Sequence, residues 1–227
     1  MRKENAVMRI FADTANLEEL AKLKEMGMVD GVTTNPSIIS KEGQDALEVL
    51  KKVCDMFPDL PVFGQVTAED KDGMIEQAKR INSVGPHMVV KIPSTMEGIK
   101  AVAALSEMGI QTCATAVLTA AEALLLAQAG ATYVAPYTGQ NDIIGFRGTD
   151  TLEQIADVYA RLGYKTQILA ASIEKAQEMV DYFTSGADCI TVPYFVFEKT
   201  FTSPGPLTTH YINNFKRDWE NAGCYIK

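Results

Sequence analysis

The chain has 227 residues, of which 47% are hydrophobic, and its formal net charge at pH 7 is -8. This length is sufficient for one large domain with a substantial core. An acidic chain lacks the basic face that nucleic-acid binding needs, so we expect no nucleic-acid partner. No apolar run approaches the roughly 18 residues of a membrane span, and the first residues do not resemble a signal peptide, so we expect a cytoplasmic protein without a membrane partner.

The cysteines and histidines are too scattered to suggest a metal site or a disulfide framework. No CxxC pair occurs among the four cysteines, and His87 and His210 lie far apart in the sequence. A zinc site needs several such ligands at close spacing. We therefore predict buried thiols, no metal and no cofactor.

Eight short apolar segments are predicted to be strands, in chain order at residues 8–12, 30–33, 61–67, 89–92, 111–117, 132–136, 167–171 and 188–192. Between them, apolar residues recur at helical spacing. Three helix starts carry a capping-box pattern: Asn16-x-x-Glu19, Ser94-x-x-Glu97 and Thr119-x-x-Glu122. The connection over 137–148 is the longest in the chain and contains three glycines, which is typical of a functional loop.

Regular alternation of strands and helices without a linker predicts a single α/β domain over residues 1–227, a (β/α)8 TIM barrel. A doubly wound open sheet is the alternative, because alternation alone does not prove closure. Residues 206–227 form an additional C-terminal helix in this prediction. Leu207, Tyr211, Phe215 and Trp219 recur at fourfold spacing along it and form an apolar stripe.

Lys91 is unusual because it stands inside an aliphatic strand, between Val90 and Ile92. Burial of an unpaired ammonium is costly, so such a site favours the neutral amine. A neutral amine is a nucleophile for carbonyl groups, which makes Lys91 a candidate Schiff-base residue. The alternative is a lysine whose stem packs on the strand while its head reaches water or a carboxylate.

Polar residues follow most of the other predicted strands at their carboxyl ends, where the chemistry of a barrel gathers. They are Asp13, Thr33, Asn35, Gln65, Thr115, Tyr137 and Ser172. Each has a structural explanation when it is taken alone, as a cap, a turn residue or a common β-former. Their joint placement around one strand lysine favours a catalytic site.

Schiff-base chemistry assigns a use to several of these groups. The amine attacks a ketone, water leaves, and the protonated imine lets the neighbouring carbon–carbon bond break. Asp13 and Asn35 can bind substrate hydroxyls, and Gln65 with Thr115 can hold a water beside the imine. The phenol of Tyr137 can deliver or take a proton.

Three motifs together resemble the transaldolase family: Gly31-Val-Thr-Thr-Asn-Pro-Ser-Ile38, Val90-Lys-Ile-Pro93 and Ala170-Ala-Ser172. Gln65 and Tyr137 are similar to the fructose-6-phosphate aldolase branch, since true transaldolases usually place glutamate and phenylalanine there. The resemblance implies that Lys91 forms the imine, that Asp13 and Asn35 bind the dihydroxyacetone portion, and that Tyr137 is the acid/base. It also implies a homo-oligomer, a pentamer or decamer, in which the C-terminal helix reaches a neighbour.

Two positions depart from family members that act on phosphosugars. Those members usually carry an arginine three residues after the tyrosine and a basic residue two after the serine. Here the two residues are Gln140 and Glu174. Because an arginine fork is the natural clamp for a dianion, fructose 6-phosphate becomes a doubtful substrate.

Other groups nearby can bind the substrate's terminal group. Arg147, Lys175 and Ser172 are the candidates, with Thr33 and Gln140 completing the predicted substrate-binding set. A sulfonate carries a single negative charge and needs less compensation than a phosphate. We therefore consider 6-deoxy-6-sulfofructose, the substrate of sulfosugar transaldolases that resemble this branch, beside fructose 6-phosphate.

The sequence thus predicts a class I, metal-independent aldolase or transaldolase. It would cleave a 6-substituted fructose between carbons three and four and either release dihydroxyacetone or transfer it to an aldehyde. Its partners would be the small ketose and aldehyde. There are two competing hypotheses: a barrel that binds sugar without turnover, and a metal-dependent aldolase. The chain has only two histidines as metal ligands, which argues against the metal-dependent aldolase.

Overall fold

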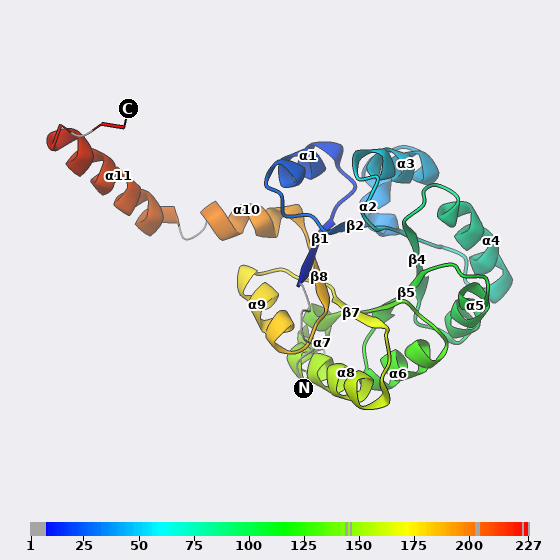
Figure 1. Cartoon of the computed structure of the whole chain (residues 1–227). Coiled ribbons are helices and arrows are strands. Elements are labelled where there is room, and N and C mark those ends of the chain that lie inside the picture. Colours follow the sequence, from blue (N-terminus) through cyan, green and yellow to red (C-terminus); the bar gives the residue numbers. More distant parts are fainter. Residues whose placement is uncertain (1–7, 144, 146, 203–204, 224, 227) are drawn as a thin grey trace.

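Eight parallel strands close into a barrel in the computed structural model, which describes residues 8–143, 145, 147–202, 205–223 and 225–226 (Figure 1). The strands are β1 (Arg9–Asp13), β2 (Gly31–Thr33), β3 (Val62–Gln65), β4 (Met88–Pro93), β5 (Thr112–Val117), β6 (Tyr133–Pro136), β7 (Gln167–Ala170) and β8 (Cys189–Val192). Each strand pairs with the next, and β8 pairs with β1. The predicted TIM barrel is confirmed, and closure excludes the doubly wound open sheet.

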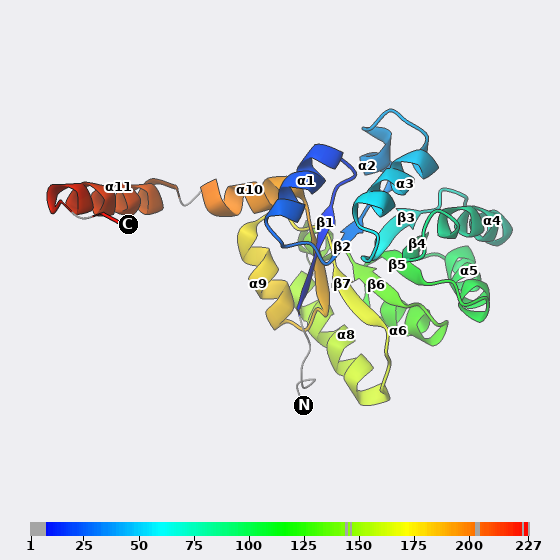
Figure 2. The same cartoon turned by 45° about the horizontal axis from the view of Figure 1, so that its top comes forward.

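Helices surround the barrel in chain order: α1 (Leu17–Glu25), α2 (Pro36–Ser40), α3 (Ala46–Met56), α4 (Lys71–Asn82), α5 (Met96–Glu107), α6 (Ala120–Gln128), α7 (Thr138–Ile143), α8 (Gly148–Leu162) and α9 (Ala176–Thr184). After β8 the chain forms α10 (Tyr194–Thr202) and α11 (Gly205–Asn221). Both views show α11 projecting away from the barrel (Figures 1 and 2). None of the helices in the described ranges is long and apolar enough to cross a membrane.

Side-chain alternation along the strands divides the apolar residues into two cores. The larger core lies between the barrel and its helices, and it includes Ile190 and Val192 of β8. The smaller core fills the barrel and includes Cys189 of the same strand. Inward-facing residues therefore recur at every second position of a strand. This alternation determines which polar side chains can face the barrel interior and reach its mouth.

Aromatic rings and one arginine fill the amino-terminal end of the barrel. The ring centroid of Phe63 lies 5.5 Å from that of Phe11 and 5.1 Å from that of Tyr133. The guanidinium of Arg9 lies 5.4 Å from the Phe11 ring and donates a hydrogen bond to Gln167. This end is packed, so a substrate can enter the barrel only from the carboxyl end of the strands.

The helix starts match the predicted caps with one exception. Asn16 caps α1, and Thr119 with Glu122 forms the predicted capping box of α6. The cap of α5 is Thr95, whose hydroxyl accepts from Gly98 N, so the prediction of Ser94 was wrong by one residue. Three further helices were not predicted: α2 begins at Pro36, where a turn was expected, α7 begins inside the long connection over 137–148, and α10 follows Pro193.

Candidate active site

The carboxyl ends of the strands bring most of the predicted site residues to one end of the barrel. Asp13, Thr33 and Gln65 are the last residues of β1, β2 and β3. Lys91 is Gln65's Cα partner in the pairing of β3 with β4. Thr115 lies on β5, and Tyr137 directly follows β6 and bridges to Ala171. The parallel strands thus place an amine, a carboxylate, a carboxamide, two hydroxyls and a phenol at the same mouth.

Lys91 is buried, with 6% of its surface exposed. Its Nζ donates a 2.9 Å hydrogen bond to the backbone carbonyl of Thr34, which follows β2. Cys113 is the Cα partner of Lys91 on β5, and burial raises the pKa of this thiol to about 12. Cys113 therefore remains a protonated thiol near neutral pH, and the amine of Lys91 is the stronger candidate nucleophile at this level of the barrel.

Asp13 is held by a short chain of hydroxyl groups. Thr33 Oγ1 donates a 2.7 Å hydrogen bond to Asp13 Oδ1, and Thr33 Oγ1 also contacts Thr191 Oγ1 on β8. Burial raises the pKa of the Asp13 carboxyl, while the positive charge of Lys91 and the hydrogen bond from Thr33 act in the opposite direction. Among the described residues none donates a hydrogen bond to Oδ2, which leaves that oxygen available to a substrate hydroxyl.

Gln65 and the pair Thr115–Tyr137 supply neutral polar groups near the amine. Gln65 Oε1 is buried without a hydrogen-bond partner among the described residues. Thr115 Oγ1 lies 3.3 Å from the phenol oxygen of Tyr137. A buried acceptor without a partner is costly unless water or a ligand satisfies it. The Gln65 carboxamide can therefore bind a water molecule beside Lys91.

The backbone is distorted where β5 ends beside Thr115. The register of β5 against β6 shifts between Thr115 and Val117, and Ala116 has φ +58°. Bulges of this kind turn the flanking side chains in new directions and are enriched next to active sites. The shift lets Tyr137 N bond to Val117 O while the Thr115 hydroxyl still meets the Tyr137 phenol.

Asn35 and Ser172 lie in the loops after β2 and β7. Asn35 caps α2 through its Oδ1, which accepts from Ile38 N at 2.9 Å, so this oxygen has a structural use. Ser172 adopts the left-handed conformation, with φ +66°. Gly139 packs so closely on Ser172 that an added Cβ would lie 2.4 Å from the Ser172 carbonyl oxygen, and the glycine is therefore required there.

The predicted head-group residues are only partly brought together. Gln140 Nε2 lies 3.4 Å from Ser172 Oγ, so these two neutral groups are neighbours. Arg147 precedes α8 and lies 3.7 Å from Asp150, with 79% of its side chain exposed. Lys175 precedes α9 and lies 4.0 Å from Glu178, with 78% exposed. Each of these two cations is thus paired with an acid on its own helix.

A cleft of about 640 Å³ opens on the side of the mouth formed by the β3–α4 and β4–α5 connections. Gln65 is the predicted catalytic residue that lines it, together with Pro36, Met74, Pro93 and Met96. Thr67, Glu69, Thr95 and Glu97 complete its polar wall. The cleft gives the Gln65 carboxamide a path to solvent.

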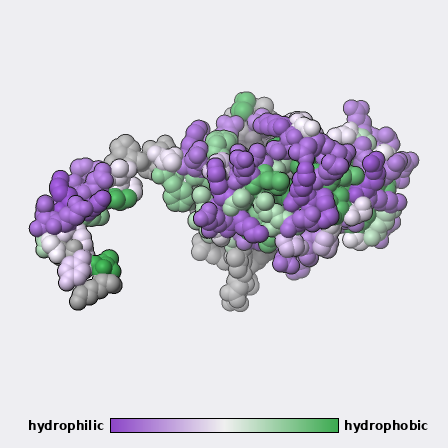
Figure 3. All heavy atoms as spheres, turned by 90° about the horizontal axis from the view of Figure 1, so that it is seen from above, coloured by the Kyte–Doolittle hydropathy of each residue, from purple (hydrophilic) through white to green (hydrophobic). Residues whose placement is uncertain are grey.

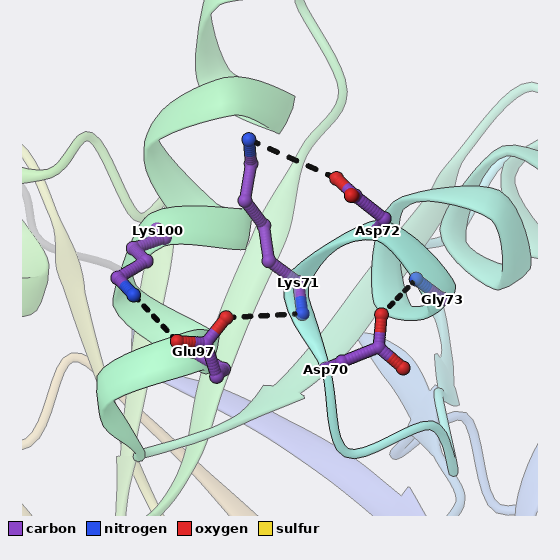
Figure 4. A network of polar contacts seen from close by, with 6 residues as sticks. All are labelled: Asp70, Lys71, Asp72, Gly73, Glu97 and Lys100. Atoms are coloured by element: carbon purple, nitrogen blue, oxygen red, sulfur yellow. Dashed lines mark hydrogen bonds and ion pairs between the residues drawn. The ribbon is translucent and has the colours of Figure 1, made fainter.

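Glu97 joins the two connections that form this cleft (Figure 4). Its Oε2 accepts from Lys71 N at 3.3 Å, and its Oε1 pairs with Lys100 at 2.5 Å. The hydrogen bond from Lys100 lowers the pKa of Glu97. The carboxylate in the first turn of α5 therefore accepts a hydrogen bond from the first residue of α4. Its negative charge is already compensated by the ammonium of Lys100.

Thr191 lies just below the mouth on the inner face of β8 and was not among the predicted site residues. It is buried, with 5% of its surface exposed, and it faces inward because Ile190 and Val192 on either side face the helices. The available signal was the alternation of strand β8 itself, in which Cys189 and Thr191 share one face. A threonine in a strand is so common that its polarity alone gave no indication.

Within the described part of the chain, no three side chains of histidine, cysteine, aspartate and glutamate are grouped so that they could hold a metal ion. The residues at the mouth instead offer an amine and neutral hydrogen-bonding groups around one carboxylate. This donor set suits covalent capture of a carbonyl compound.

Comparisons with known proteins identify relatives over nearly the whole chain. Residues 10–224 match the family model described as Transaldolase/Fructose-6-phosphate aldolase. A probable transaldolase of Exiguobacterium sp. strain AT1b is 43% identical over 95% of this chain and 99% of its own length. The probable transaldolase of Agathobacter rectalis is 44% identical over 93% of this chain and 97% of its own length. That of Methanococcus maripaludis is 41% identical over 94% of this chain and 98% of its own length.

Among solved structures, one titled "Native KDPGal structure" superimposes with a TM-score of 0.59 over 85% of each chain. At 12% identity this likeness concerns the barrel fold alone. The family match covers nearly the whole chain, and the relatives share more than 40% of their residues with it. The chain is a transaldolase- or aldolase-type enzyme and belongs to the transaldolase/fructose-6-phosphate aldolase family.

Proposed function

We propose that the enzyme cleaves a 6-substituted fructose between carbons three and four, with dihydroxyacetone held as an imine on Lys91. The observation that carries this proposal is the amine of Lys91, 6% exposed and hydrogen-bonded to a backbone carbonyl at the open end of the barrel. Asp13, Gln65 and the Thr115–Tyr137 pair accompany it at the same end. These are the groups that imine formation and proton transfer need.

The reaction divides into steps that these side chains can serve. The Lys91 amine adds to the C2 carbonyl, and water leaves as the imine forms. The C3–C4 bond then breaks: its electrons pass to the imine nitrogen, and the C4 hydroxyl loses its proton toward Tyr137, directly or through water. Asp13 accepts a hydrogen bond from a hydroxyl of the retained unit, and Asn35 is the second group proposed to bind this unit. The enamine is finally protonated and hydrolysed, or it attacks an acceptor aldehyde.

The terminal group of the ketose would meet Gln140 and Ser172, which lie 3.4 Å apart. Neutral donors of this kind suit a singly charged sulfonate better than a phosphate dianion. Arg147 and Lys175, each 78% or more exposed and paired with an acid, contribute long-range attraction rather than a fixed clamp. We therefore favour 6-deoxy-6-sulfofructose over fructose 6-phosphate, and steady-state rates on the two sugars test the choice.

Borohydride reduction in the presence of ketose tests the imine itself. We expect the intact mass to rise by one reduced dihydroxyacetone unit, and peptide mapping to place this unit on Lys91. Lys91→Met should abolish both trapping and turnover. Lys52→Met, a change at an exposed lysine on α3, should leave both unchanged. A ketose that binds without a trapped adduct would instead indicate a barrel that only holds sugar.

Association of several copies is also part of this proposal. The stripe formed by Leu207, Tyr211, Phe215 and Trp219 is 48% to 67% exposed along α11. The space-filling view shows both hydrophilic and hydrophobic residues on this projecting helix (Figure 3). Such an apolar stripe is normally covered, and a second copy is the partner that every copy has available. We propose a pentamer or decamer.

The free, buried thiols of Cys54, Cys113 and Cys189 support a cytoplasmic location.

A further inference from the structure

We propose that Thr191 is a positioning residue for the reaction: through Thr33 it fixes the Asp13 carboxylate in the orientation that binds the substrate hydroxyl. This inference rests on the proposed function, in which Asp13 contacts the retained three-carbon unit. Thr191 pairs with Phe11, two residues before Asp13 on β1, so it lies deeper in the barrel than the carboxylate. Its surface is 5% exposed, and that of Thr33 is 1% exposed.

Three neighbouring strands provide the geometry. Asp13 and Thr33 are Cα partners in the pairing of β1 with β2, and Thr191 is the Cα partner of Phe11 in the pairing of β1 with β8. Phe11 and Asp13 are two residues apart and face the same side of β1. The hydroxyls of Thr33 and Thr191 therefore meet in the barrel interior, one level below the carboxylate, at an Oγ1–Oγ1 distance of 2.5 Å.

Counting protons fixes the direction of the chain. A threonine hydroxyl has one proton, and Thr33 gives its own to Asp13 Oδ1. The contact between the two threonines consequently needs the Thr191 proton, so Thr191 donates to Thr33 Oγ1. The Thr33 hydroxyl is then held at both ends and cannot rotate away from the carboxylate.

This arrangement has two consequences for Asp13. Oδ1 is occupied, so Oδ2 is the oxygen presented to the substrate. Each hydroxyl that donates also becomes a better donor when it accepts, so Thr191 strengthens the bond from Thr33 and favours the charged carboxylate. The other groups that act on the Asp13 charge are Lys91 on β4 and Lys41 at the end of α2. Neither is altered when Thr191 is replaced.

Thr191→Val removes the hydroxyl and keeps the β-branched shape, which suits the strand. We expect kcat/KM to fall about tenfold, as for the loss of one positioning hydrogen bond. The acid limb of its pH profile should move to higher pH. Thr191→Ser should restore both. Thr112→Val is the matched control and should change neither quantity. The Thr112 hydroxyl is also buried in a barrel strand, but it has no hydrogen-bond partner in the described part of the chain.

A double-mutant cycle tests whether Thr191 acts on Asp13 through Thr33. In a Thr33→Val background, replacing Thr191 by valine should have no further effect. The inference is overturned if Thr191→Val has the kcat/KM and the pH profile of the wild type. It is also overturned if kcat/KM falls in Thr191→Val but is not restored in Thr191→Ser. If Thr191→Val does not fold, Thr191→Ser and Thr191→Ala are compared in the same way.

Borohydride trapping separates this inference from the proposed function. Thr191→Val should still form the Lys91 adduct, because the amine is held by Thr34. Failure of the wild type to form the adduct removes the proposed function. If the wild type and Thr191→Val both form the adduct and have equal kinetics, only the proposed role of Thr191 is contradicted.

Discussion

Gln65 and Lys91 lie opposite each other where β3 pairs with β4. The buried carboxamide oxygen of Gln65, which has no hydrogen-bond partner among the residues that the structure describes, therefore lies beside the buried amine. Two neighbouring strands thus place a water-binding group next to the group that must lose and regain water during imine chemistry. The cleft lined by Gln65 connects this position to the solvent.

Gln65→Leu should slow turnover. Hydrolysis of the imine loses its water-binding acceptor, and we expect kcat to fall about 10-fold to 100-fold. Steady-state kinetics measure this loss, and thermal denaturation checks that the variant remains folded. Thr112→Val, which removes a buried hydroxyl on β5, is the control and should leave kcat unchanged. Equal activity losses in both variants would contradict this role for Gln65.

Tyr137→Phe should separate imine formation from bond cleavage. The phenol lies 3.3 Å from Thr115 Oγ1 and is the predicted acid/base, so its removal should lower kcat by about 100-fold to 10,000-fold. Borohydride trapping should persist, since Lys91 is untouched. Tyr164→Phe is the control, because the Tyr164 hydroxyl bonds to Gln128 on the outer helices. Full activity of Tyr137→Phe would exclude the phenol as acid/base.

The sequence predicted the barrel and most of the mouth because both depend on local patterns. Apolar strands and the positions at their ends can be read residue by residue, which is how Asp13, Gln65 and Lys91 were found together. Thr191 was missed because its partner, Thr33, is 158 residues away, and strand register cannot be read from one sequence. Arg147 was one of the candidates to compensate for Gln140, and its ion pair with Asp150, three residues along the chain, was not predicted.

Asp13→Asn should stabilise the enzyme at neutral pH and inactivate it. Burial raises the pKa of Asp13 above its ordinary value of 3.8, so the folded state binds more protons than the unfolded state just above that value. Stability supplied by this group is therefore lost as the pH rises. The Tm difference between the variant and the wild type should be near zero at pH 3.8 and below and positive at pH 7, and kcat/KM should fall about 100-fold.

Asp157→Asn, at an exposed position on α8, should show neither change. A Tm difference for Asp13→Asn that is independent of pH would mean that burial does not oppose the charge of this carboxylate.

Gln140→Arg should shift substrate preference toward the phosphosugar. An arginine next to Ser172 supplies the charge that a dianion needs, and one charge-assisted contact is worth about tenfold in kcat/KM. The gain for 6-deoxy-6-sulfofructose should be smaller. Gln111→Arg adds the same charge just before β5, at the opposite end of the barrel, and should not change the ratio of the two rates. An unchanged ratio in Gln140→Arg would place the terminal group elsewhere.

Replacing Phe215 and Trp219 together by glutamate should reduce the size of the assembly. Both side chains are exposed on one face of α11, at 67% and 48%, and α11 projects from the barrel rather than packing on it. Two charges on this stripe would oppose its burial against a second copy. Light scattering should give a pentamer or decamer for the wild type and a smaller species for the variant, with an unchanged circular dichroism spectrum. Leu162→Glu, at a 61% exposed position on α8, should keep the wild-type mass, and a monomeric wild type would exclude the proposed assembly.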